Sequence, residues 1–580
     1  MCLTMRTTAI GLALAFGCFP LVGATARESV VAIPTPFEIG DSPSGNYLAA
    51  LIAGAERDTV AASTFFREAL RADPKNSELT ERAFVAALAN GSFPDALALG
   101  ERLILRDPTN GVANLTLGVQ AIKLKQWALA RAHLSKGGAA RPRDVTATLL
   151  TAWTYAGAGD EKKALEVVDR LNDGNFTIFR DYHAALIADV LGDSVEATKR
   201  FKAVYAAEKN TLRLIDAYAR FMDRHGDAAE AKRAYQAFDK LVPNHPLVKA
   251  ALADLAAGKT LDPLVTSADA GAAEVLYGLG AAGGREGDEL ASMIYLRLSL
   301  YLAPTNALAL VTLADFYDRV KQDERAVDVY EMIPQDSPLR VNAEIQIGLT
   351  LDALGRTDDG IKQVKAIVAD RPKDVDALSA LANLYSVQKR YDEAEETFTR
   401  AIDVIGTPDA SNWALFYRRG ITRERQNKWP LAESDFKEAL TLFPDQPLVL
   451  NYLGYSWVDK GMNLEEGFNM LRRAVDQRPN DGFIVDSLGW AHFRLGQYDE
   501  AVKDLERAID LKPSDPVIND HLGDAYWRVG RKLEAKFQWN HARDAQPEKD
   551  DLPRILKKIE DGLPEDKPAE AVVVPKKTGG

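Results

Sequence analysis

The sequence contains almost no cysteine. Only Cys2 and Cys18 occur among its 580 residues, and both lie near the N-terminus. Such a chain has no disulfide framework, and it shows no cysteine–histidine arrangement of the kind that builds a thiol nucleophile. We therefore expect the fold to be stabilised by side-chain packing and not by covalent cross-links.

Histidine is also scarce. Seven histidines are scattered along the chain, and none pairs with another at the H-E-x-x-H spacing that places two imidazoles around a metal ion. The chain also lacks a P-loop, a kinase signature and a G-x-S-x-G nucleophile elbow. A loose group of triad-type residues comprises Asp486, Ser487, His492, Asp520 and His521. Because Ser487 has no strained turn to activate it, the sequence predicts a protein that is not an enzyme, with no catalytic residue, metal or cofactor.

Gly278, Gly280 and Gly283 match the dinucleotide-binding pattern G-x-G-x-x-G by letter alone. That fingerprint follows a strand, opens a helix, and is joined about twenty residues later by an acidic side chain. Here residues 272–277 are helix-like, and the later position is apolar at Tyr301 and Leu302. The context argues against nucleotide binding.

Basic residues are outnumbered, with 71 Lys and Arg against 84 Asp and Glu and a formal net charge of −13. A general nucleic-acid binder needs a concentrated Lys/Arg face for phosphate contacts, and none appears. Beyond the N-terminal region, no run of eighteen or more apolar residues occurs. The sequence therefore predicts neither a nucleic-acid partner nor a transmembrane span.

An apolar run near the N-terminus follows Arg6, extends from Ala9 through Val22, and ends in the triplet Ala24-Thr25-Ala26. This pattern is typical of a secretory signal peptide, so we expect residues 1–26 to be cleaved and both cysteines to leave with them. The expected compartment is the periplasm. The alternative is an outer-membrane lipoprotein facing the periplasm and anchored at Cys18, although Ala15-Phe16-Gly17 is a poor lipobox.

What the sequence does contain is a repeat of 34 residues. Prolines recur at this step in three runs, namely Pro74, Pro108 and Pro142, then Pro304, Pro338 and Pro372, then Pro479, Pro513 and Pro547. Proline ends a helix because it lacks the N–H group and disfavours helical geometry in the residue before it.

Other residues keep this register when each proline is numbered as position 32. Small residues recur at position 8 (Gly118, Gly348, Gly420, Gly489, Gly523), position 20 (Ala130, Ala326, Ala432, Ala501, Ala535) and position 27 (Ala69, Ala439, Ala508, Ala542). Aromatic residues recur at position 11 (Tyr155, Tyr317, Tyr385, Tyr526) and position 24 (Phe66, Phe201, Tyr235, Tyr330, Phe398, Phe436, Trp539). Small side chains let helices approach closely, and aromatic ones fill the wedge between hairpins.

On these residues the chain resembles the tetratricopeptide repeat family over roughly residues 43–547. The resemblance implies an all-α fold, a right-handed tetratricopeptide α-solenoid of about fourteen helical hairpins in two arms. Such arrays present extended binding surfaces, so partner recognition is expected in place of catalysis.

The expected organisation has seven parts: a signal peptide 1–26, an extended lead-in 27–46, an N-terminal array 47–243, a phase-breaking insert 244–272, a C-terminal array 273–547, a capping helix 548–562 and a disordered tail 563–580. The 34-residue phase is lost in the insert, which is therefore expected to be a joint between the arms. The capping helix, with Lys557 and Lys558 outward, should cover the apolar face of the last hairpin.

The family resemblance implies that positions 2, 5, 9, 12 and 13 of each first helix face a concave groove. In the last three hairpins the candidate partner-binding residues are Asn451, Tyr455, Asp486, Trp490, Arg494, Asp520, Asp524, Trp527 and Arg528. Large aromatic side chains there are candidate anchors, because Trp and Tyr dominate binding hot spots; packing between neighbouring repeats is the alternative. The aspartates disfavour a carboxylate ligand and suit neutral or basic segments, or another folded protein.

Three segments, 450–457, 486–490 and 520–527, are more particular than the repeat requires. They look like the C-terminal array of bacterial envelope tetratricopeptide adaptor lipoproteins that partner a carboxyl-terminal processing protease and help it degrade peptidoglycan hydrolases. The resemblance implies a noncatalytic periplasmic scaffold that brings such hydrolases to the protease. The alternative is a periplasmic chaperone or assembly factor for exported or outer-membrane proteins.

Overall fold

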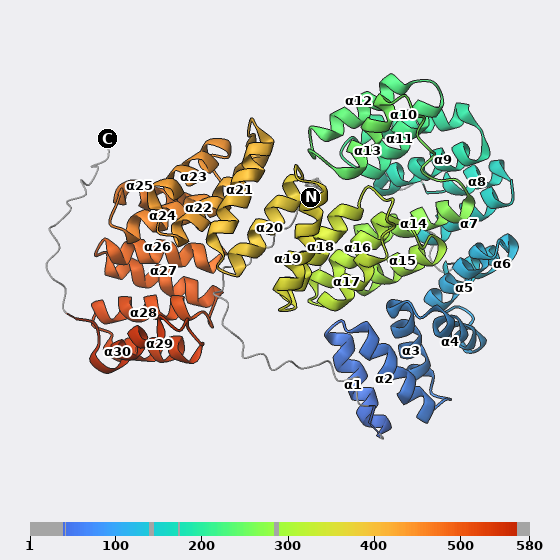
Figure 1. Ribbon diagram of the computed structural model, residues 1–580. Helices are drawn as coiled ribbons and strands as arrows, with labels where there is room; N and C mark the ends of the chain where they lie inside the picture. The colour runs from blue at the N-terminus through green and yellow to red at the C-terminus, as the bar shows by residue number, and fades with distance from the viewer. Residues whose placement is uncertain (1–38, 41, 139–143, 172–173, 284–288, 565–580) are drawn as a thin grey trace, which may run out of the picture. The chain divides into compact units, whose positions relative to one another are not determined.

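The computed structural model describes residues 39–40, 42–138, 144–171, 174–283 and 289–564. Within these ranges the protein is all-α, with thirty α-helices, two short 3₁₀ helices and no strand. The chain divides into two compact units, and the boundary between Ile367 and Val368 falls within one helix, α19. Unit 1 precedes this boundary and unit 2 follows it (Figure 1).

The helices of unit 1 are α1 (Pro43–Ala55), α2 (Thr59–Ala72), α3 (Ser77–Asn90), α4 (Phe93–Arg106), α5 (Gly111–Lys123), α6 (Trp127–Gly138), α7 (Val145–Gly157), α8 (Glu161–Val168), η1 (Gly174–Phe176), α9 (Thr177–Leu191), α10 (Ser194–Ala207), α11 (Leu212–Arg224), α12 (Ala228–Asp239), α13 (Pro246–Ala256), α14 (Ala268–Ala282), α15 (Glu289–Leu302), α16 (Ala307–Arg319), α17 (Asp323–Glu331), α18 (Arg340–Ala353) and α19 (Thr357–Asp370).

The helices of unit 2 are α20 (Val375–Val387), α21 (Tyr391–Ile405), η2 (Ala410–Asn412), α22 (Trp413–Arg425), α23 (Trp429–Leu442), α24 (Pro447–Asp459), α25 (Leu464–Gln477), α26 (Gly482–Arg494), α27 (Tyr498–Leu511), α28 (Pro516–Arg528), α29 (Lys532–Asp544) and α30 (Leu552–Asp561).

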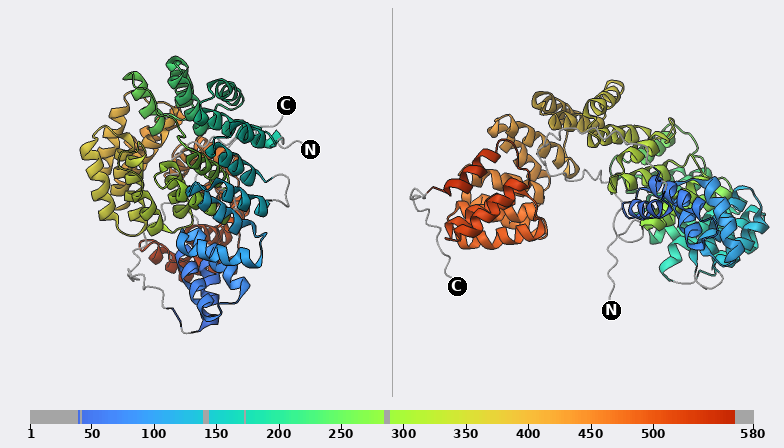
Figure 2. Two further views of the ribbon diagram at one scale, coloured as in Figure 1. Left: turned by 90° about the vertical axis from the view of Figure 1, so that its right-hand side faces the viewer. Right: turned by 90° about the horizontal axis from the view of Figure 1, so that it is seen from below.

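Fourteen pairs of consecutive helices pack as hairpins, from α1/α2 to α11/α12 and from α14/α15 to α28/α29, while α13 and α30 belong to no pair and pack on α12 and α29. Figure 2 shows the hairpins of unit 2 stacked in chain order. Many first helices begin at a side-chain cap, as at Asn110, Asp374 and Asp515, whose side chains accept backbone N–H bonds from the first turn. The fold class expected from the 34-residue period is thereby confirmed.

The recurring small and aromatic positions meet inside each hairpin, as the repeat pattern predicts. The glycine at position 8 lies against the residue at position 24 of the same hairpin: a Cβ atom added to Gly420 would lie 2.7 Å from the Phe436 ring, and one added to Gly523 would lie 2.4 Å from Trp539. The position-24 rings are buried, with Phe436 and Trp539 fully so. Glycine is needed there because no side chain fits between the two helices.

The segment 244–272 differs from the expected joint between two arms. It contains α13, followed by an irregular stretch whose backbone is held by unit 1: Arg220 donates to the Asp262 carbonyl, and the Leu261 N–H donates to Asp223. The chain then turns into α14, which packs against α5, α7 and α9, while α15 packs against α3 and α5. The segment therefore returns the chain onto the first hairpins and lies inside unit 1.

Other expected boundaries shift by a few residues. The lead-in ends earlier than expected, because α1 begins at Pro43, where Ser42 caps the first turn. The capping helix α30 spans Leu552–Asp561, within the expected 548–562. Lys557 is exposed as expected, but Lys558 is buried, because its ammonium group bonds to carboxylates of α28. The signal peptide, most of the lead-in and nearly all of the expected tail lie outside the described residues.

Candidate functional site

The predicted groove residues lie on three consecutive first helices of unit 2. α24 carries Asn451 and Tyr455, α26 carries Asp486, Trp490 and Arg494, and α28 carries Asp520, Asp524, Trp527 and Arg528. α22 precedes them in the array, and α30 occupies the place of a further first helix, with Arg554 and Lys558 at positions 5 and 9.

The three aspartates are buried and paired within the chain, so they differ from the expected partner-facing acids. Asp486 bonds to His521 at 3.0 Å, and Lys558 Nζ lies 2.8 Å from Asp520 and 2.7 Å from Asp524. Each pair joins one first helix to the next. Because these carboxylates are buried and paired with cationic groups of neighbouring helices, they do not give the groove an acidic surface.

Trp527 and Arg528 are covered by the segment that follows α29. The backbone of Gly562 lies against the Trp527 ring, and Arg528 donates to the Pro564 carbonyl at 2.9 Å. The Trp527 ring also lies 5.4 Å from the Trp539 ring, centroid to centroid. These two residues therefore contact the C-terminal cap, and residues 562–564 cover part of the surface that a partner could otherwise reach.

Asn451, Tyr455, Trp490 and Arg494 keep part of their surface exposed, and their role in partner binding stays a prediction. Trp490 is stacked between Phe493, at 4.8 Å between ring centroids, and His521, at 4.1 Å. Burial and the nearby carboxylates of Asp486 and Asp459 raise the pKa of Tyr455, so its hydroxyl stays protonated. Arg494 is held by Asp459 at 3.0 Å.

Three polar atoms on this inward face are buried and have no hydrogen-bond partner among the described residues. They are Asn383 Nδ2 on α20, Asn451 Oδ1 on α24 and Trp490 Nε1 on α26. Asn383 stands at position 9 of its hairpin, so the inward-facing register could have identified it in the sequence. A buried polar atom without a partner costs about 1–3 kcal/mol, and a bound segment with free N–H and C=O groups could supply the missing partners once these side chains rotate toward it.

The triad-type residues do not assemble into a nucleophilic site. Ser487 donates to the Phe483 carbonyl at 3.0 Å, one turn back along α26, as serines inside helices commonly do. His492 bonds to Gln497, while His521 bonds to Asp486 and stacks on Trp490. Within the described part of the chain, no group of three or more His, Cys, Asp or Glu side chains is placed to hold a metal ion.

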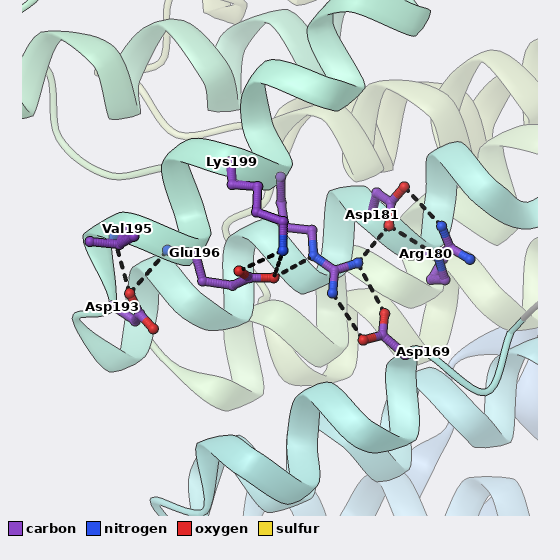
Figure 3. Close-up of polar contacts among 8 residues, drawn as sticks. Asp169, Arg180, Asp181, Asp193, Val195, Glu196 and Lys199 are labelled. Carbon is purple, nitrogen blue, oxygen red and sulfur yellow. Dashed lines mark hydrogen bonds and ion pairs between the residues drawn. The ribbon is translucent and has the colours of Figure 1, made fainter.

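A charged cluster in unit 1 is also structural. The guanidinium of Arg200 contacts Asp169 at 2.9 Å, Asp181 at 2.8 Å and Glu196 at 2.7 Å, which ties the end of α8 to α9 and α10 (Figure 3). The hydrogen bond from Arg200 lowers the pKa of Glu196. Since each carboxylate already has its cation, this cluster offers no open site.

Comparison with known proteins identifies repeats of the same kind. Residues 489–530 match a family model described as TPR repeat, and residues 345–411 match one described as tetratricopeptide repeat. A TPR repeat-containing protein of Pseudomonas aeruginosa is 27% identical over 186 residues, which are 31% of this chain and 30% of that protein. A protein O-mannosyl-transferase of Homo sapiens is 26% identical over 134 residues, 23% of this chain and 15% of its own length.

Solved structures resemble the chain at lower identity. The alignment with a chain from the crystal structure of the APC/C hetero-tetramer Cut9-Hcn1 covers 90% of this chain and 97% of that chain, with a TM-score of 0.39 and 14% identity. The alignment with yeast Tom70 covers 89% of this chain and 95% of the Tom70 chain, with a TM-score of 0.32 and 13% identity. None of the described helices is long and apolar enough to cross a membrane.

Proposed function

We propose that this tetratricopeptide repeat chain is a noncatalytic scaffold that binds other proteins on the inward face of unit 2. The observation that carries the proposal is the neutral strip from α20 to α26, where Asn383, Asn451, Tyr455 and Trp490 combine partly exposed rings with buried, unpartnered polar atoms. Aromatic side chains anchor protein interfaces, and side-chain amides bind the main chain of an extended segment. Such a strip favours a neutral partner segment.

The proposed setting is the periplasm, reached through the signal peptide expected in residues 1–26. There the scaffold would hold a carboxyl-terminal processing protease beside peptidoglycan hydrolases, as the resemblance of residues 450–457, 486–490 and 520–527 to envelope adaptors implies. Holding enzyme and substrate on one array raises their effective concentration to about the millimolar range. No chemistry by the scaffold itself is required.

The test removes the unpartnered atoms without disturbing the fold. Trp490→Phe keeps an aromatic ring but removes the indole N–H, and Asn451→Leu keeps the volume but removes the amide oxygen. Because neither atom has a partner in the free protein, the double variant should keep its free energy of unfolding within about 1 kcal/mol. Phe537→Ala, which truncates a side chain that is 61% exposed on α29, is the matched control.

The mature full-length protein and both variants are mixed with a cell-envelope extract, and co-purifying proteins are identified by mass spectrometry and then rebuilt from purified components. We expect a processing protease or cell-wall hydrolase in fixed stoichiometry, bound at least tenfold more weakly by the double variant than by Phe537→Ala. Equal recovery of many unrelated exported proteins by all three forms would favour a chaperone. Undiminished binding of one partner by the double variant would remove the groove assignment.

A further inference from the structure

The concave face of the first hairpins in unit 1 is occupied by part of the same chain. α14 lies along α5, α7 and α9 (Figure 1), and it reaches α11 through an ion pair. On α7 and α9 it meets Trp153 and Tyr182, which stand at positions 9 and 5 of their hairpins, the register that faces inward. α14 therefore occupies the groove in which a tetratricopeptide array would hold an external segment.

The contact between α14 and the groove includes a buried carboxylate site. Glu274 of α14 is 4% exposed and accepts hydrogen bonds from Arg213 Nε at 2.9 Å and from the Tyr182 hydroxyl at 2.9 Å. A second guanidinium nitrogen of Arg213 bonds to the other carboxylate oxygen. Although burial alone would raise the pKa of Glu274, Arg213 and Tyr182 keep it below its ordinary value, so the group is a carboxylate.

The groove also selects the shape of the helix that it holds. Gly271, Glu274, Val275 and Gly278 lie on one face of α14, because residues three, four and seven apart share a helix face. A Cβ atom at Gly271 would lie 2.3 Å from the Trp153 ring, and one at Gly278 would lie 2.9 Å from the Phe179 ring. The two aromatic rings therefore accept a helix only where its side chains are absent, with a carboxylate between these two points.

α14 also buries apolar side chains, with Val275 and Leu276 fully buried, so the ion pair of Glu274 is a polar addition to an apolar contact. A buried ion pair contributes little net stability compared with apolar packing, and charged contacts are more typical of interfaces that form and separate. His183, which is fully buried beside this contact, keeps Nε2 without a hydrogen-bond partner in the described structure. The groove thus carries more binding chemistry than α14 uses.

We propose that the concave face of hairpins α5 to α12 is a binding site for an α-helix with a carboxylate flanked by glycines on one face, and that α14 is its resident, displaceable ligand. The partner is a helix of this class on another protein. Arg213 and Tyr182 bind its carboxylate, while Trp153 and Phe179 exclude helices with larger side chains at the flanking points. This site lies in unit 1 and is independent of the proposed function of unit 2.

The experiment loosens α14 without altering the groove. Gly271→Val places a side chain against Trp153 and should expel α14, whereas Ala282→Val changes an exposed position at the end of the same helix and is the control. The probe is a fluorescently labelled peptide of residues 267–283, added to the mature full-length protein and followed by fluorescence anisotropy. A second peptide carries Glu274→Gln.

We expect Gly271→Val to bind the native peptide at least tenfold more tightly than the wild type and Ala282→Val do, because a larger fraction of the groove is open. The Glu274→Gln peptide should bind at least tenfold more weakly, and adding Arg213→Gln should abolish binding. The proposal fails if Gly271→Val binds the native peptide no more tightly than the wild type does. It also fails if the affinity is unchanged by Glu274→Gln in the peptide and by Arg213→Gln in the protein.

Hydrogen exchange decides whether the groove survives the loss of α14. The amides of α6, α8 and α10 should stay protected in Gly271→Val. Their general loss of protection would show that α14 is an integral part of the core of unit 1, and it too would overturn the proposal. Binding of a unit 2 partner by the same variant should be unchanged, so the two proposals fail separately.

Discussion

At the scale of single residues, two buried histidines have pKa values shifted in opposite directions. His183 sits among Trp153, Phe179 and Tyr182, and burial lowers its pKa to about 4. Burial also disfavours the charged form of His521, but the Asp486 carboxylate 3.0 Å away outweighs it and raises the pKa of His521. The first is therefore neutral in the folded protein near neutral pH, and the second holds its proton more firmly than usual.

The raised pKa of His521 predicts a pH dependence of stability in unit 2. The folded state binds the proton more tightly than the unfolded state, so this contribution is complete below the ordinary pKa of 6.5 and is lost as the pH rises through the raised value. Relative to His521→Gln, the wild type should lose stability over that window, by at most about 1.4 kcal/mol per pH unit. Urea unfolding followed by tryptophan fluorescence measures it, because six of the eight tryptophans lie in unit 2.

His541→Gln is the control for this prediction, since His541 is exposed on α29 of the same unit. An identical pH profile for His521→Gln and the wild type would mean that the Asp486 pair does not hold the proton in the folded state. For His183 the sign is reversed: stability is lost as the pH falls below 6.5, because only the unfolded chain then takes up the proton.

At the scale of helices, α30 is fixed to the array by charge as well as by apolar packing. Lys558 is 7% exposed and lies between Asp520 and Asp524, and Arg554 contacts Asp520 at 3.1 Å. Ile555 is buried in the same helix against the last hairpin. The cap thus reproduces the place of a first helix, with cations where the preceding helix presents carboxylates.

Lys558→Met should therefore destabilise unit 2 by about 3 kcal/mol, because it leaves two buried carboxylates without their main cation. Lys557→Met, one residue away and exposed, should change stability by less than about 0.5 kcal/mol. Denaturant unfolding of the two variants gives the comparison. Adding Asp520→Asn and Asp524→Asn to Lys558→Met should recover much of the loss, and failure to recover would point to lost packing of the lysine stem in place of unpaired charge.

The repeat pattern predicted the helices well but not these contacts. The small residue at position 8 and the ring at position 24 follow from the 34-residue period, and Gly280 keeps that register against Leu296 even within the G-x-G-x-x-G letters. The burial of Asp520 could not be predicted, because its cation lies 38 residues away in a helix whose lysines were both expected to face solvent. Periodicity identifies positions that face inward, but it does not say what covers them.

At the scale of the whole chain, the two units differ in how far apart in sequence their contacts reach. In unit 2 the contacts join mainly neighbouring hairpins, and two of its ion pairs, Arg494–Asp459 and His521–Asp486, link one first helix to the next. Unit 1 closes on itself: Thr59 bonds to Tyr317 at 3.4 Å, Arg57 to Glu289 at 3.3 Å, and Arg297 of α15 to the Ala89 carbonyl at 3.2 Å. Contacts between helices so far apart in the sequence do not recur with the 34-residue period, so the sequence did not predict them.

Because the stability of unit 2 comes mainly from contacts between neighbouring hairpins, residues 371–564 should fold without unit 1. Circular dichroism should show a helical fragment with a cooperative thermal transition, and limited proteolysis should trim its first hairpin, α20/α21, before the others. Gly482 to Asp561 should resist longest, because α30 closes that end. A fragment with little helix at 25 °C would show that the boundary near Ile367 does not separate independent folding units.

The occupied groove of unit 1 also fixes an order of events during synthesis. The surfaces of α5, α7 and α9 are complete well before α14 leaves the ribosome, about 120 residues after Trp153. At a synthesis rate of about 5–20 residues per second, the aromatic floor formed by Trp153 and Phe179 stays uncovered for roughly ten seconds. During that interval each new chain offers its neighbours an empty helix-binding groove, which makes the arrival of α14 the step that ends the exposure of the nascent protein to misassembly.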